Sequence, residues 1–366
     1  MELAIDFILV TGIIVNVIIL LVLSKTRRLL LHQKLFFAIL VILLLLLVTS
    51  YGIFHGINWL QYLAVLTNGI TYLLGPLIYL YVKSLGSENK GILRKNRKHF
   101  IPFALYFVLI TIPLLISVVS KKYVFLYLEI LNDNGYIVNC IEILFELFYL
   151  IISLRLFYRL NASLKNVFST LEYKNIRWIE VLCWGLILFA CVHLVVISME
   201  EMNGESSILD FILACSYVGF VCYLGYYGLQ QKHSDQVSAE APIVIAKRKY
   251  MTDEEVDELT SIIASTFPSQ KPYLDEELNL KKLASILQTS DKKLSYYLNN
   301  HLQTNFYDFV NTYRVDAFKT KLANNEQEHY SILGLAYDSG FRSKSSFNRI
   351  FKKETGLSPS AYLKTL

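Results

Sequence analysis

Residues 331–353 read SILGLAYDSGFRSKSSFNRIFKK, and their pattern is the strongest structural signal in the C-terminal part of the chain. Apolar residues at helical spacing lead to Gly340, and a second helical pattern with a basic, hydroxyl-rich outer face follows. A helix, a tight turn and a second helix form the layout in which the second helix enters the major groove of DNA. The stretch therefore predicts a helix-turn-helix unit with Gly340 in its turn.

The same pattern occurs once before in the chain. A first helix is predicted at 280–287 and a second at 291–300, with a short turn between them. Each copy carries an alanine in its first helix, Ala284 or Ala336, and such a small side chain lets the second helix cross closely. Apolar positions in 306–323 fit one long helix, which we expect to connect the two copies.

This region resembles the DNA-binding domain of the AraC/XylS family of regulators. The resemblance implies two helix-turn-helix units joined by a helix, with double-stranded promoter DNA as the partner. Leu333, Gly334 and Leu363 depart from the family pattern, which usually has polar residues at the first two positions and a basic residue at the third. The matching residues are Leu283, Ala284, Ser290, Leu294, Ser295, Phe306, Tyr313, Arg314, Ala317, Ala336, Gly340, Phe341, Phe347, Phe351, Lys352, Lys353, Gly356, Ser358, Pro359 and Tyr362.

A DNA-reading helix contacts base edges with its N-terminal half, while flanking cations contact phosphates. On the second unit we expect Lys344 and Asn348 to read guanine and adenine, and Lys352 and Lys353 to meet phosphates. Residues 278–366 carry 13 Lys and Arg against 7 Asp and Glu, so charge alone would also fit a solvated helix face. The other residues predicted to face outward in the interface are Lys292, Lys293, Ser295, Tyr296, Asn299, Arg342, Ser343, Ser346 and Arg349.

The first 229 residues are of a different kind, because they hold nearly all the long apolar runs of the chain. Seven segments approach or exceed the roughly 18–20 apolar residues that a helix needs to cross a membrane. The predicted fold class is all-α, with a seven-transmembrane bundle followed by a cytoplasmic helical domain. The first segment has an acidic flank and no small-residue cleavage site, so we expect a retained span. The segments are 4–24, 35–55, 62–82, 100–119, 137–157, 181–199 and 208–229.

The loops after the first, third and fifth segments hold fifteen Lys and Arg residues, whereas the loops on the other side hold only Lys121 and Lys122. Because positive loops stay in the cytoplasm, the bias places the N-terminus outside and the C-terminal domain inside. Residues 230–249 lack helical periodicity and predict a flexible connector, and 250–366 form the DNA-binding domain. The expected location is the inner membrane of a bacterium, with lipid as a further partner.

Three ionisable residues fall within the apolar segments, where charge is costly. Glu142 and Glu146 are four residues apart and share a helical face, and His193 lies at a similar depth. One hypothesis is a site open to the outside that binds a cationic or polar ligand, or senses pH. The other, which we favour at this point, is that the three groups satisfy one another, or neighbouring Asn and Thr side chains, inside the bundle.

The leading functional hypothesis is a one-component regulator, in which a signal sensed by the membrane part controls DNA binding. One alternative is a transporter or channel with a regulatory tail. Another is a membrane enzyme that uses Glu142, Glu146 and His193, but no HExxH, GxSxG, P-loop or kinase signature occurs in the sequence. We therefore expect no enzymatic activity and no cofactor. The five cysteines lie in apolar segments without metal-ligand spacing, and the signal ligand and a homodimer stay open.

Overall fold

The computed structural model describes residues 2–25, 29–86, 91–120, 124–170, 177–203, 207–230 and 251–365. These ranges form helices and connecting turns and divide into two compact units, which confirms the all-α prediction. Unit 1 comprises Met1–Tyr158 and Ile176–Ala239, and unit 2 comprises Arg159–Asn175 and Glu240–Leu366. The predicted connector 230–249 lies outside the described residues apart from Gln230, as do Lys121 and Lys122.

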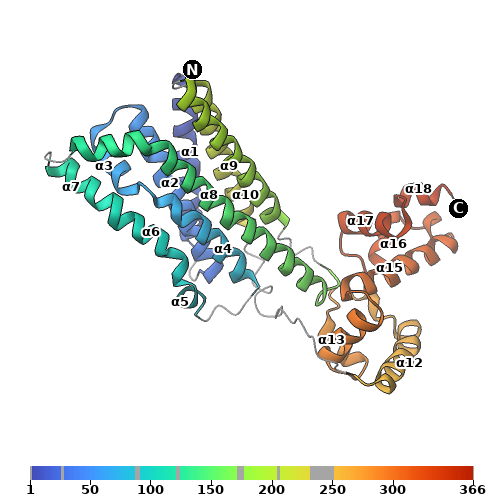
Figure 1. Ribbon diagram of the computed structural model, residues 1–366. Coiled ribbons are helices and arrows are strands. Elements are labelled where there is room, and N and C mark those ends of the chain that lie inside the picture. Colours follow the sequence, from blue (N-terminus) through green and yellow to red (C-terminus); the bar gives the residue numbers. More distant parts are fainter. Residues whose placement is uncertain are drawn as a thin grey trace. The chain divides into compact units, whose positions relative to one another are not determined.

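Among the described residues, seven helical stretches of 18 to 30 residues are long and apolar enough to cross a membrane, so the seven predicted segments are confirmed as helices of that kind. They lie in unit 1, except that the fifth, Tyr136–Lys165, ends in unit 2. Helix α1 packs along α2 and α10, and α2 packs against α3 and α4 (Figure 1). The helices are α1 (Glu2–Ser24), α2 (Leu31–Phe54), α3 (Asn58–Thr67), α4 (Leu74–Leu85), α5 (Ile92–Lys95), α6 (Ile101–Tyr106), α7 (Ile112–Ser120), α8 (Val124–Lys165), α9 (Arg177–Asn203) and α10 (Ser207–Gln230).

The third membrane-length stretch is interrupted between α3 and α4. Helix α3 ends at Thr67, and Gly69 adopts a left-handed conformation with φ of +75°. A 3₁₀ turn, Ile70–Leu73, then leads into α4. Pro76 does not cause this interruption, because it lies in the first turn of α4, where a missing N–H breaks no helical hydrogen bond. Asn68 at the interruption accepts hydrogen bonds on its side chain from Tyr106 (2.6 Å) and on its carbonyl from Thr111 (3.1 Å). Neighbouring helices thus satisfy the polar groups that the break exposes.

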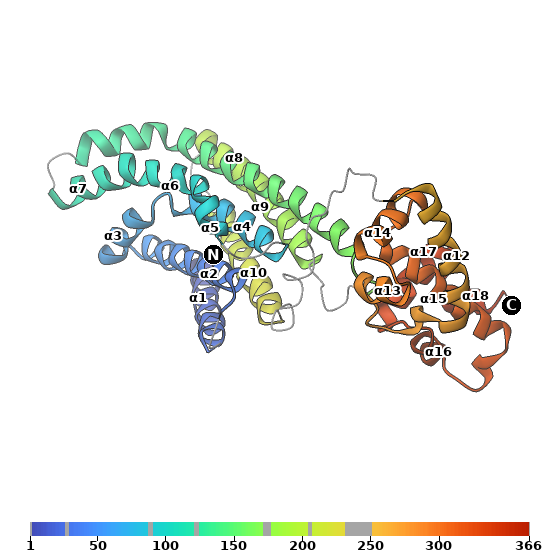
Figure 2. The same cartoon turned by 90° about the horizontal axis from the view of Figure 1, so that it is seen from below.

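In unit 2, helix α15 contacts α16 and α17 directly and shares a hydrophobic core with α12, α13 and α14 (Figure 2). The predicted helix pairs are present as α13–α14 and α16–α17, and α15 is the predicted connecting helix. Ala284 and Ala336 are both buried, as their small size at a helix crossing requires. The elements are α12 (Asp253–Gln270), α13 (Leu280–Ile286), α14 (Asp291–Tyr296), α15 (Phe306–Ala323), α16 (Ile332–Asp338), α17 (Lys344–Thr355) and α18 (Pro359–Leu363).

Each of the helices α12 to α18 begins after a Ser, Thr or Asn whose side-chain oxygen accepts a backbone N–H of the first turn. Such a cap satisfies one of the N–H groups that have no partner within the helix. At α12 the cap is reciprocal, because Glu255 also accepts the N–H of Thr252. The start of each of these helices in unit 2 is therefore marked by a capping residue that can be recognised in the local sequence. The capping residues are Thr252, Asn279, Ser290, Asn305, Ser331, Ser343 and Ser358.

Two separate hydrophobic cores stabilise the part of unit 2 that the structure describes. The first joins α12, α13 and α14 to the N-terminal half of α15, and the second joins the C-terminal half of α15 to α16 and α17. Each helix-turn-helix unit therefore has a core of its own, and α15 is the element that contributes to both. The fully buried members are Leu283, Leu294, Leu298, Phe306 and Val310 in the first core, and Phe318, Leu335, Ala336 and Phe351 in the second.

Candidate nucleic-acid interface

The second recognition helix, α17, has an apolar and a polar face. Phe347, Ile350 and Phe351 are buried in the second core, and Ser346 is buried beside them at 8% exposure. The prediction that Ser346 faces outward is therefore wrong, because its position in the first turn brings it to the packing face. Its N–H donates to the Ser343 side chain (3.3 Å), which caps the helix.

Lys344, Asn348 and Lys352 form a stripe along the exposed face of α17. They are four residues apart, so they share one side of the helix, and all three are exposed. Among the residues that the structure describes, none of these three side chains has a hydrogen-bond or ion-pair partner. The stripe therefore presents two ammonium groups and one amide that can bind an external partner without first breaking a hydrogen bond or ion pair to the described residues.

The other predicted cations of the second unit already have partners in the structure. Lys353 pairs with Asp308 (2.7 Å), Arg342 pairs with Glu277 (3.4 Å), and Arg349 donates to the Tyr307 hydroxyl (2.7 Å). Burial by itself raises the pKa of Asp308, but the hydrogen bonds from Lys353 and Asn305 outweigh that effect and lower the pKa below its usual value. Lys353, Arg342 and Arg349 must exchange or share these partners to contact DNA.

The first unit presents fewer unengaged groups. On α14, Lys292 is exposed, whereas Lys293 donates to Glu255 at 2.6 Å. That hydrogen bond, together with the N–H of Thr252, lowers the pKa of Glu255. Ser295 and Asn299 are bonded to each other, and Tyr296 packs partly on the first core. The first unit therefore offers less polar surface for base contacts than the second.

The three ionisable residues of the membrane-length helices lie around one cavity in unit 1. Glu142, Glu146 and His193 line a space of about 220 Å³ together with Tyr217. Among the described residues, no hydrogen bond or ion pair joins the two glutamates or His193 to one another. The three residues lie around one cavity, as their positions in the sequence suggested. The described residues show no hydrogen bonds among these three side chains. The aromatic lining is Phe36, Tyr81, Trp178, Phe189 and Phe220.

Comparison with known proteins gives one matching family model and several relatives that match about a third of the chain. A family model described as a helix-turn-helix domain matches residues 283–365. Proteins named uncharacterized HTH-type transcriptional regulators, from Staphylococcus aureus strains COL, MSSA476 and N315, are 27% identical over 117 residues. This alignment covers 32% of the chain and only 14% of the length of those relatives. No solved structure matches significantly. Residues 283–365 thus form a helix-turn-helix domain of the AraC type.

Proposed function

We propose that this chain is a membrane-bound, one-component transcription regulator whose unit 2 binds double-stranded DNA. The observation that carries the proposal is the exposed stripe of Lys344, Asn348 and Lys352 on the second helix of a helix-turn-helix unit. Seven apolar helices of membrane length in unit 1 support an inner-membrane location, and a DNA-binding domain has to lie on the cytoplasmic side.

The stripe fits the chemistry of the major groove. A lysine near the start of a recognition helix donates to the O6 and N7 of guanine, and an asparagine can pair with the N6 and N7 of adenine. Lys344 occupies the first position of α17 and Asn348 follows one turn later, so both belong to its N-terminal half. Lys352 lies two turns from Lys344 on the same face of α17, and we expect it to contact a phosphate. One chain carries two such units, so a monomer has two groove-entering helices.

The test is selection of DNA from a random library by the full-length protein in lipid nanodiscs. Lys344→Ala and Asn348→Ala should each cost about 1–3 kcal/mol at one base position and relax selectivity there. Lys352→Ala should weaken all sequences equally and reduce the salt slope of log K by about 0.9. Lys364→Ala, which removes an exposed charge beyond the last helix, is the matched control. Equal competition by unselected DNA would refute sequence-specific binding.

For the membrane part, we propose that the cavity at Glu142, Glu146 and His193 receives the controlling signal. Two carboxylates without mutual hydrogen bonds, surrounded by aromatic rings and with no Lys or Arg among the lining residues, suit a small organic cation. Binding of benzyltrimethylammonium to the full-length protein should be measurable by calorimetry. Glu142→Gln/Glu146→Gln should abolish it, while Glu180→Gln, a glutamate of α9 outside the cavity lining, should leave it unchanged. If the double variant binds benzyltrimethylammonium with the affinity of the wild type, the sensing proposal is wrong.

A further inference from the structure

A short segment that the sequence places between the fifth and sixth apolar helices belongs structurally to unit 2. Phe168 and Asn279 form an antiparallel bridge. The N–H of Ser169 donates to the carbonyl of Leu278 (3.4 Å), and the N–H of Leu280 donates to the carbonyl of Val167 (2.9 Å). The segment 167–170 thus pairs by its main chain with the residues that lead into the first helix-turn-helix unit.

Side chains strengthen this pairing. The Ser169 hydroxyl donates to the carbonyl of Leu278 (2.5 Å), and the Thr170 hydroxyl donates to the carbonyl of Glu276 (2.9 Å). Ser169 is only 1% exposed and Phe168 only 6%. The segment is therefore seated in unit 2 rather than lying on its surface.

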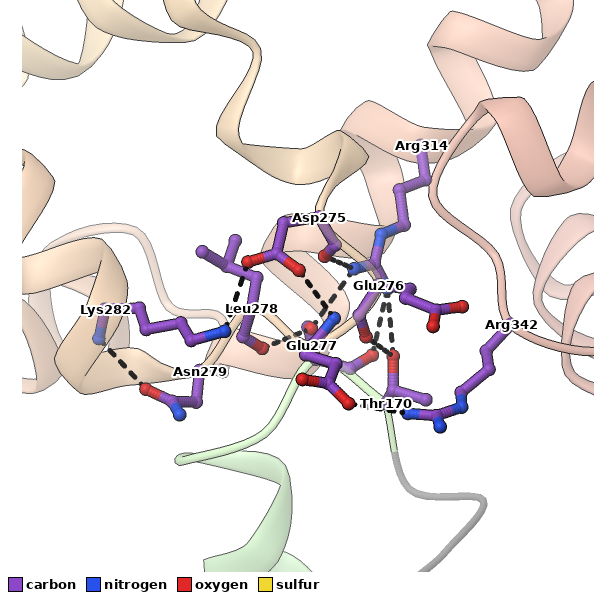
Figure 3. A network of polar contacts seen from close by, with 10 residues as sticks. Thr170, Asp275, Glu276, Glu277, Leu278, Asn279, Lys282, Arg314 and Arg342 are labelled. Atoms are coloured by element: carbon purple, nitrogen blue, oxygen red, sulfur yellow. Dashed lines mark hydrogen bonds and ion pairs between the residues drawn. The ribbon is translucent and has the colours of Figure 1, made fainter.

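Arg314 holds the segment from the other side (Figure 3). Its guanidinium is almost completely buried, at 1% exposure for the residue, and donates to the carbonyls of Tyr273 (2.8 Å) and Asp275 (2.8 Å). It also donates to the carbonyl of Ser169 (3.3 Å), to the Ser169 hydroxyl (3.2 Å) and to the Thr170 hydroxyl (3.3 Å). A buried guanidinium needs its donors satisfied, and residues 169–170 supply a large part of what Arg314 bonds to.

Arg314 lies where the two hydrophobic cores meet. It follows Val310, which belongs to the first core, and precedes Val315, which belongs to the second. The two cores are separate, and Arg314 lies on α15 between them.

The turn of the second unit reaches the same place. A Cβ added to Gly340 would lie 3.0 Å from the Arg314 Nε and would overlap the carbonyl oxygen of Tyr273. Beside it, Arg342 pairs with Glu277 at 3.4 Å, in the strand-like stretch that receives the segment (Figure 3). Residues from both helix-turn-helix units thus gather around Arg314, in the surroundings that the segment completes.

We propose that the surface formed by Asp275–Leu280 and Arg314 is the regulatory docking site for the chain's own segment 167–170. When seated, the segment restricts the relative orientation of the two DNA-reading units; when it is withdrawn, that orientation is less restricted and is limited by α15 and its contacts with α17. The segment continues directly from α8, which is one helix from Val124 to Lys165, so a displacement of α8 acts on it through a short covalent connection. The inference rests on the proposed DNA binding and adds the route by which the membrane helices control it.

The docked state has a specific reporter. Leu280 is the first residue of α13, so its N–H has no partner within the helix, and the carbonyl of Val167 is the acceptor it has in the structure. Hydrogen exchange at this amide in the full-length protein should therefore be slow only while the segment is seated.

The variant Ser169→Ala/Thr170→Val removes four side-chain hydrogen bonds of the segment and leaves its backbone pairing. Ser169→Pro is a second variant, because proline cannot donate to Leu278. The matched control is Ser261→Ala/Thr312→Val, which removes two exposed hydroxyls of unit 2 that bond to carbonyls of their own helices. Each lost hydrogen bond changes the docking equilibrium by a factor of roughly five.

The experiment compares these proteins in nanodiscs, on DNA selected by the wild type and on a fragment with one half-site scrambled. We expect exchange at Leu280 to become at least about tenfold faster in both segment variants. Affinity for the two-site DNA should fall about tenfold, with affinity for the single half-site unchanged, because the second contact loses its effective concentration.

Unchanged exchange at Leu280 in both variants, or an unchanged ratio of two-site to one-site affinity, would overturn the inference. A fall in both affinities together would also overturn it, because that result indicates general destabilisation. Failure of the proposed function gives a different result, since the wild type would then select no DNA sequence at all.

Discussion

Alanine at Gly340 tests whether the turn of the second helix-turn-helix unit is locked against the Arg314 region. Gly340 has φ of +89°, and an added Cβ would overlap the carbonyl oxygen of Tyr273 and lie 3.0 Å from the Leu274 Cα. Both neighbours are backbone atoms, which cannot turn aside as a side chain can. Gly356, with φ of +77° and no atom within 4 Å of an added Cβ, is the matched control.

The expected magnitudes follow from these two environments. A left-handed backbone costs an alanine about 1–2 kcal/mol relative to glycine, and this is the whole expected effect of Gly356→Ala. At Gly340 the same cost applies, and forcing the backbone neighbours apart adds about 1–3 kcal/mol. With a urea m value of about 1.5 kcal/mol/M, the midpoint should fall by about 1 M for Gly356→Ala and about 2–3 M for Gly340→Ala.

Pulse proteolysis of the full-length protein in urea, followed through a C-terminal tag, measures the unfolding of unit 2. Tryptophan fluorescence does not serve, because Trp59, Trp178 and Trp184 all lie in unit 1. Equal midpoint shifts for the two alanine variants would refute the reasoning, since the contact between Gly340 and Tyr273–Leu274 would then contribute nothing beyond the backbone conformation.

Three further predictions concern separate parts of the molecule. Ser343→Ala should lower the free energy of unfolding of unit 2 by about 1 kcal/mol, because it removes the cap of α17, while Ser345→Ala, whose residue caps no helix, should have little effect in the same urea assay. Since the pKa of Asp308 is lowered in the folded state, its pairing with Lys353 stabilises unit 2 above the unfolded pKa near 4, and this contribution is lost as pH falls through the folded value. Lys353→Gln should reduce the loss of stability on acidification by well under about 1 kcal/mol, because Lys353 is 56% exposed, and an unchanged acid profile would contradict the assignment. Gly75→Ala should lower the thermal stability of the detergent-solubilised protein, because an added Cβ would lie 2.7 Å from the Tyr149 Cβ, whereas Gly219→Ala, with open space around it, should not.

The helices of unit 2 were predictable because their signals are local. Capping residues such as Thr252 and Ser343, and the small buried Ala284 and Ala336, fix where helices begin and where they cross. The seven apolar helices were predictable for a similar reason, since length and hydropathy need no knowledge of neighbours. The break in the third stretch could not be predicted in this way, because its position depends on hydrogen bonds that Asn68 accepts from residues distant in the sequence.

The predicted interface was harder, because helical periodicity says which side of a helix is polar but not which polar side chains are already engaged. Lys352 and Lys353 are adjacent cations in the sequence, yet Lys353 meets Asp308 and Lys352 extends without a partner among the described residues. Likewise Ser346 reads as an outward hydroxyl in a serine-rich stretch, but the first turn of α17 brings it to the packing face. Both outcomes depend on contacts with α15 or the second core, which are distant in the sequence.

Arg314 shows the same limit in its strongest form. In the sequence it is one more basic residue of a DNA-binding domain, and its resemblance to the family pattern gives it no role of its own. In the structure it is buried and bonded to carbonyls from two distant parts of the chain, 169 and 273–275. A guanidinium bonded in this way cannot also contact phosphate. Arg314 therefore adds to the positive charge of the domain but not to the number of cations that can bind DNA. Arg314→Gln, which removes the charge, should therefore leave the salt slope of DNA binding unchanged while destabilising unit 2. A reduced salt slope would show that Arg314 leaves its buried site and contacts DNA.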